Sequence, residues 1–76
     1  MSTIDNLASQ LAEDTLVAMD KTGDDRLYIE VAATLAASSQ SLEEAFLTEV
    51  RLRLSERTAR AFLNRRLAAA GPADDG

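Results

Sequence analysis

Residues 41–70 read SLEEAFLTEVRLRLSERTARAFLNRRLAAA and contain neither glycine nor proline. Apolar side chains recur through this stretch at helical spacing, and alanine, leucine, arginine and glutamate, which are strong helix formers, dominate its composition. The stretch opens with a capping-box pattern, in which Ser41 is expected to be the N-cap and Glu44 the third helical residue. The sequence therefore predicts one long helix over residues 42–70.

The length of this helix is unusual for a chain of 76 residues. A straight helix over residues 42–70 would measure about 43 Å, whereas a globular chain of this size is only about 30 Å across. Either the helix breaks, with Ser55 as a second N-cap, or its C-terminal half extends beyond the rest of the chain. We expect the extension, because Leu54-Ser55-Glu56 contains no strong helix breaker.

Two shorter helices are expected before the long one. The first covers residues 3–21, with Ser2 or Thr3 as its N-cap and Gly23 after its end; the second covers residues 25–37 and is capped by Asp24 or Asp25. One face of the first helix is expected to carry the apolar residues Ile4, Leu7, Ala8, Leu11, Ala12, Thr15 and Met19. The fold class is thus all-α, with three helices in a single domain over residues 1–70 and a disordered tail over residues 71–76.

The second and third helices carry more apolar surface than one short chain can bury. The second is apolar nearly all round, and two neighbouring helices can hardly enclose it. The third carries two apolar stripes, although both could also belong to one broad core face. We therefore predict a dimer or higher oligomer that completes a helical bundle. The expected interface residues are Ala32, Ala33, Ala36, Leu52, Leu54, Phe62, Leu63 and Leu67. Phe46 is expected to pack in the core. For Phe62 both readings stay open, core packing and an anchor that inserts into a groove of a partner.

Charge is distributed unevenly along the chain, whose net charge is -5. Residues 1–50 hold ten acids and two bases, a net of -8, whereas residues 51–66 hold six arginines and one acid, a net of +5. Arg53, Arg57 and Arg60 share a helix face that could contact an anion or an acidic partner. We favour an antiparallel dimer that brings the acidic half of one chain to the basic half of the other, which would fix orientation more than it would add affinity.

The residue types argue against catalysis and against a bound metal or cofactor. The chain has no cysteine and no histidine, so it lacks zinc ligands of these types and the usual activating bases. An EF-hand reading of the acidic segment that begins at Asp20 fails, because positions 6 and 12 are Asp25 and Val31. We expect neither an enzyme nor a metal site.

The sequence favours a small non-catalytic protein–protein interaction module, a self-associating accessory or regulatory subunit in the cytoplasm with no membrane span. A second protein as partner stays open. One alternative is a nucleic-acid-binding regulator that uses the arginine-rich helix, which is less favoured because the chain is acidic overall and no aromatic residues alternate with the arginines. Another is an acidic inhibitor of a basic client protein.

Overall fold

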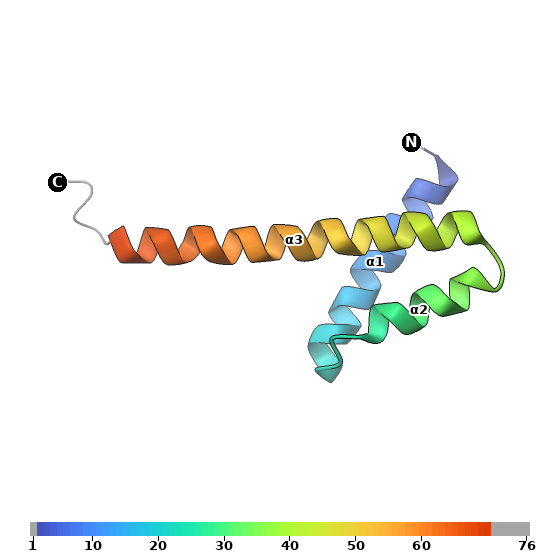
Figure 1. Cartoon of the computed structure of the whole chain (residues 1–76), viewed down its shortest axis with the longest axis horizontal. Coiled ribbons are helices and arrows are strands. Elements are labelled where there is room, and N and C mark those ends of the chain that lie inside the picture. The colour runs from blue at the N-terminus through green and yellow to red at the C-terminus, as the bar shows by residue number, and fades with distance from the viewer. Residues whose placement is uncertain (1, 71–76) are drawn as a thin grey trace.

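The computed structural model describes residues 2–70, which form three helices: α1 (Thr3–Thr22), α2 (Leu27–Ala36) and α3 (Gln40–Ala70) (Figure 1). The described residues contain no strand, so the predicted all-α class and the order of two shorter helices followed by a long one are confirmed. The predicted tail over residues 71–76 lies outside the described residues. None of the helices within residues 2–70 combines the length and the apolar character needed to cross a lipid bilayer.

The ends of α1 follow from local hydrogen bonding. Ser2 is the N-cap, and its hydroxyl accepts from the backbone N–H of Asp5 at 3.0 Å. At the other end Gly23 adopts a left-handed conformation with a φ of 75°, and its N–H donates to the carbonyl of Met19 at 2.8 Å. Only glycine adopts this conformation at low cost, so the chain turns here. Both signals were readable in the sequence.

The start of α2 differs from the prediction. Its N-cap is Arg26, which makes no side-chain capping bond, and the helix begins at Leu27. The carboxylate of Asp24 instead accepts from the backbone N–H of Arg26 at 3.0 Å, which stabilises a turn before the helix. The predicted cap at Asp24 or Asp25 was therefore wrong. Asp24 does make a local hydrogen bond, but this bond stabilises the loop before α2 and not the first turn of the helix.

The capping box predicted at Ser41 was also wrong. The Ser39 hydroxyl accepts from the N–H of Leu42 at 3.1 Å, and the Ser39 carbonyl accepts from the N–H of Glu43 at 3.0 Å. Ser39 is thus the residue that caps α3, which begins at Gln40. The reason is a tight connection: the N–H groups of Ser38 and Ser39 both donate to the carbonyl of Leu35, at 3.0 and 2.7 Å, so the chain has already reversed before Ser41.

The core lies where α1 and α2 pack on the N-terminal half of α3. Phe46 and Val50 on α3 are completely buried, as predicted for Phe46, and they contact small residues of the other two helices. The described core consists of Ala8, Ala12, Ala32, Phe46 and Val50, with the buried Thr15, Leu16 and Met19 from the C-terminal half of α1. Alanines allow the helix backbones to approach closely around the two large side chains. The three helices therefore form a hairpin of α2 and α3 crossed by α1 (Figure 1).

The C-terminal half of α3 extends away from this core. The helix runs without interruption through Ser55, so the predicted extension is confirmed and the alternative break at Ser55 is wrong. Every residue from 55 to 70 is exposed, and the molecule measures 57 × 30 × 14 Å. We call residues 58–70 the projecting segment. Figure 1 shows it reaching well beyond α1 and α2.

Candidate interaction surface

The projecting segment is helical because of its own composition rather than because of packing. Its 13 residues include five alanines, three arginines and two leucines, which all propagate a helix well. Since α3 is already nucleated in the core, the segment needs no nucleation of its own. It is nevertheless a helix in water whose apolar side chains are covered by no other part of residues 2–70.

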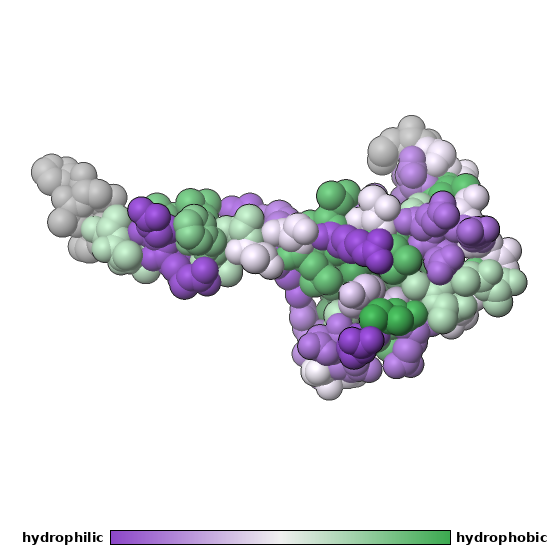
Figure 2. Space-filling view, in the orientation of Figure 1, coloured by the Kyte–Doolittle hydropathy of each residue, from purple (hydrophilic) through white to green (hydrophobic). Residues whose placement is uncertain are grey.

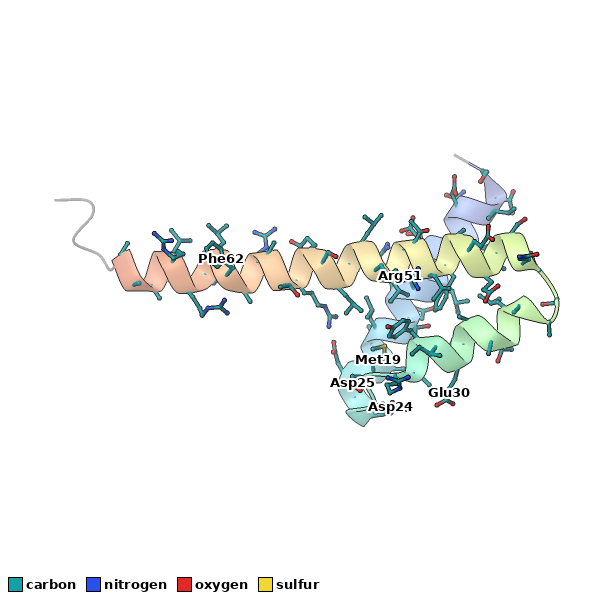
Figure 3. The ribbon with its side chains drawn as sticks, in the orientation of Figure 1. Met19, Asp24, Asp25, Glu30, Arg51 and Phe62 are labelled. Carbon is teal, nitrogen blue, oxygen red and sulfur yellow. The ribbon has the colours of Figure 1, made fainter. Side chains whose placement is uncertain are left out.

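These apolar side chains are large and well exposed. The exposed fractions are 53% for Phe62, 48% for Leu63 and 60% for Leu67. Phe62 points away from α1 and α2 (Figure 3), and the guanidinium of Arg66 lies 6.0 Å from the centre of its ring. Figure 2 shows hydrophobic and strongly hydrophilic residues next to each other along this part of the helix. Exposed apolar residues of this density are typical of an interaction surface.

One side of α3 carries a continuous apolar line that begins at the core and ends in the projecting segment. Its members follow one another at spacings of seven and four residues, which places them on one helix face. We call this set the outer stripe; it consists of Leu52, Ala59, Leu63 and Leu67. Leu52 is 60% exposed although it lies beside α1. Leu54, predicted as an interface residue, instead packs partly buried against the core.

A groove runs between α1 and α3, directly beside the outer stripe. It has a volume of about 680 Å³ and is widely open to solvent, and Leu52 forms part of its wall. The apolar floor comes from Leu16 and Val17 on α1, and Val17 is 53% exposed. Charged residues complete the wall: Glu13 and Asp14 from α1, and Glu49, Arg53, Glu56 and Arg57 from α3. We call this cavity the α1–α3 groove.

The sequence analysis missed the α1 side of this groove. Glu13, Asp14 and Val17 lie off the face that was assigned to the core of the first helix. The signal that could have found them is the pair Leu16-Val17, since two adjacent apolar residues point about 100° apart and cannot both face one core. Leu16 is buried, so Val17 necessarily points elsewhere.

The three arginines predicted to contact an anion are each engaged by a carboxylate of their own chain. Arg53 pairs with Glu49 and also donates to the hydroxyl of Ser9 at 2.8 Å. Arg57 donates through two nitrogens to Asp20 on α1, at 3.2 and 3.1 Å. In the same way Arg60 donates to Glu56 at 3.0 and 2.8 Å. The predicted face exists, but its positive charge is already neutralised locally.

Two other arginines differ in this respect. Within residues 2–70, Arg65 and Arg66 make no ion pair, and both lie on the projecting segment. Among the acidic residues, Glu13 and Asp14 of the α1–α3 groove make no ion pair in the described part of the chain. Within residues 2–70, the projecting segment thus carries two arginines without an ion pair, and the α1–α3 groove carries two carboxylates without one.

The alanine side of α2 is divided between the core and the surface. Ala32 is 4% exposed and belongs to the chain's own core, so it is not accessible to a second chain. Ala33 and Ala36 are exposed. A smaller groove between α2 and α3 is lined by Tyr28, Ile29, Ala32, Ala33, Glu43, Leu47 and Arg51. Tyr28 is partly buried and packs against the core.

No group of three or more acidic side chains within residues 2–70 converges on a point that could hold a metal ion. Asp20 is occupied by Arg57, and Asp24 by the backbone of its own turn. No family model, no curated protein and no solved structure matches the chain.

Proposed function

We propose that this chain is a small, non-catalytic protein–protein interaction module that associates with further copies of itself. The observation that carries the proposal is the projecting segment, 13 residues of α3 that expose Phe62, Leu63 and Leu67 and are covered by no other part of residues 2–70. Burying large apolar side chains is the main favourable contribution to association. The outer stripe supplies such side chains on one continuous face.

The charges favour a second copy as the partner. The projecting segment carries three arginines and no acid, whereas α1 carries four acids and one lysine, a net of -3. A second copy therefore offers an acidic surface to the basic end of the first, and by symmetry the contact is made twice. Opposite charges of this kind orient a complex that apolar contact holds together.

The face formed by Arg53, Arg57 and Arg60 is poorly suited to bind nucleic acid. Binding to the nucleic-acid backbone requires guanidinium groups that are free to neutralise phosphates and so release the counterions condensed on the nucleic acid. Arg53, Arg57 and Arg60 hold carboxylates instead, and acidic residues border the same face. Backbone phosphates would be repelled by the groove that lies beside these arginines.

Mass in solution, measured by light scattering after size exclusion at low and high salt, tests the proposal. We expect a dimer or larger species that persists in high salt, because apolar burial is the main contribution. The double substitution Leu63→Ser and Leu67→Ser should yield a monomer with unchanged helix content near the core. A matched double substitution, Ile4→Ser and Leu7→Ser, removes two exposed apolar residues of α1 and should leave the mass unchanged.

A folded monomer at millimolar concentration would refute self-association. Fluorescence anisotropy with labelled duplex DNA and single-stranded RNA provides the second measurement. We expect no saturable binding at physiological salt, whereas tight binding that weakens steeply with salt would favour the nucleic-acid alternative.

A further inference from the structure

We propose that two copies pair through antiparallel α3 helices, with the projecting segment of each copy lying along the α1–α3 groove of the other. This inference rests on the proposed self-association and adds to it the orientation and the register. It follows from the position of the groove, from the distribution of charge and from the spacing of residues along the exposed side of α3.

The groove and the outer stripe form one surface. Leu52 belongs to both, and Val17 faces the same groove from α1. A helix that covers Leu52 therefore also comes to lie beside Val17. The projecting segment of a second copy offers Leu63 and Leu67 on one face, which matches this pair of apolar residues. The α1–α3 groove of one copy and the projecting segment of the other each expose apolar side chains that the contact would bury.

The charges select the antiparallel direction. A parallel pair would place the two projecting segments side by side, each with three arginines and no acid. An antiparallel pair places each segment against the groove of the other copy, where Glu13 and Asp14 make no ion pair among the described residues. The distances across such a helix pair are about the Debye length of roughly 8 Å at physiological salt, so these charges interact.

The spacing along α3 defines the register. Glu49, Leu52, Glu56, Ala59, Leu63 and Arg66 follow one another at alternating spacings of three and four residues, the spacing of a helix seam that meets a second helix. When Leu52 lies opposite Leu63 of the second copy, Glu49 lies opposite Arg66 of that copy. Both pairs share one midpoint along the helix, and so does the pair of Glu56 with the small Ala59.

The Glu49 contact is compatible with the structure of the single chain. Its carboxylate pairs with Arg53 and is partly exposed. A carboxylate has two oxygens and accepts from more than one guanidinium group. Arg66 therefore supplies the charge across the interface while Arg53 keeps its intrachain contact.

Single-cysteine variants test the orientation and register in the full chain, which has no native cysteine. We expect a mixture of Leu52→Cys and Leu63→Cys chains to form a disulfide-linked dimer on mild oxidation. Each variant alone should stay unlinked. In the antiparallel register two copies of residue 52, or of residue 63, lie about 16 Å apart along the helix axis, which exceeds the reach of a disulfide.

Charge reversal supplies an independent test with a matched control. Arg66→Glu should raise the dimer Kd about tenfold, because two symmetry-related ion pairs are replaced by repulsion. Arg65→Glu changes the charge by the same amount on a residue about 100° away around the helix and should have a much smaller effect. Chains with Glu49→Arg and chains with Arg66→Glu should each associate weakly alone and recover when mixed.

The outcomes separate the two proposals. Monomeric mass in light scattering refutes self-association itself. A stable dimer in which L52C or L63C cross-links efficiently with itself refutes the antiparallel arrangement and favours a parallel one. A stable dimer that resists every cross-link, or that responds equally to R65E and R66E, refutes the register, whereas self-association itself stands.

Discussion

Arg57 on α3 and Asp20 on α1 form a bidentate ion pair, with nitrogen–oxygen distances of 3.2 and 3.1 Å. Among the ion pairs within residues 2–70, this one joins two helices, whereas the others lie within α3. It lies where α3 leaves the core. The pair connects the end of α1 to the base of the projecting segment.

Because both side chains are about half exposed, we expect this pair to contribute little to stability. Asp20→Ala and Arg57→Ala should each lower the free energy of unfolding by less than about 1 kcal/mol. The double variant should lose less than the sum of the two single losses. Urea unfolding of the four proteins in a double-mutant cycle measures this coupling. A coupling above about 2 kcal/mol would show that the pair is a main support of the fold.

Two phenylalanines on α3 should behave in opposite ways. Phe46 is completely buried, so Phe46→Ala should cost about 3–5 kcal/mol of unfolding free energy and leave the domain largely unfolded. Phe62 is 53% exposed, so Phe62→Ala should change the unfolding free energy of the monomer by less than about 0.5 kcal/mol. Thermal unfolding followed by circular dichroism, at concentrations below association, distinguishes them. Equal losses would mean that residues near Phe62 pack on the core.

Two serines near the start of α3 provide a second matched pair. Ser39→Ala removes the hydroxyl that accepts from Leu42 N–H and should cost about 1 kcal/mol. Ser41→Ala removes a hydroxyl within the first helical turn and should cost much less. Chemical unfolding of both variants measures the difference. A larger loss for S41A would restore the capping box that the sequence suggested.

Hydrogen exchange should divide α3 into two parts. Amides around Phe46 and Val50 open only when the domain unfolds, so they should exchange slowly. Amides of residues 58–70 have no packing over them in a single chain and should exchange rapidly at micromolar concentration. Protection of these residues should rise with protein concentration as copies associate. Protection that is independent of concentration would show that the segment is stable by itself.

The helices themselves were largely predictable, because their signals are local. Ser2 and Gly23 mark the ends of α1 through contacts with residues three and four positions away. The length of α3 follows from the absence of glycine and proline, and its extension follows from the size of a 76-residue globule. Such inferences need no knowledge of how the helices pack.

The predictions that were wrong or missing, such as the buried face of α1, depend on how the helices pack on one another. The apolar face assigned to α1 included Ile4 and Leu7, which are 41% and 48% exposed, and omitted Leu16, which is 4% exposed. Because α1 crosses α3 at an angle (Figure 1), its buried residues run only from Ala8 to Met19, and its first turn stays exposed. The crossing angle also creates the α1–α3 groove, so neither the groove nor the role of Val17 could be derived from the periodicity of a single helix.

The division of α3 into a packed half and a projecting segment also separates two kinds of selective constraint. Substitutions around Phe46 and Val50 change whether the chain folds, whereas substitutions beyond residue 57 leave the core untouched. If the projecting segment binds a partner as proposed, the affinity and identity of that partner can diverge without loss of the fold. In protein engineering, the last four turns of α3 can therefore be replaced by another helical sequence. A new binding surface can be introduced there without changing the core.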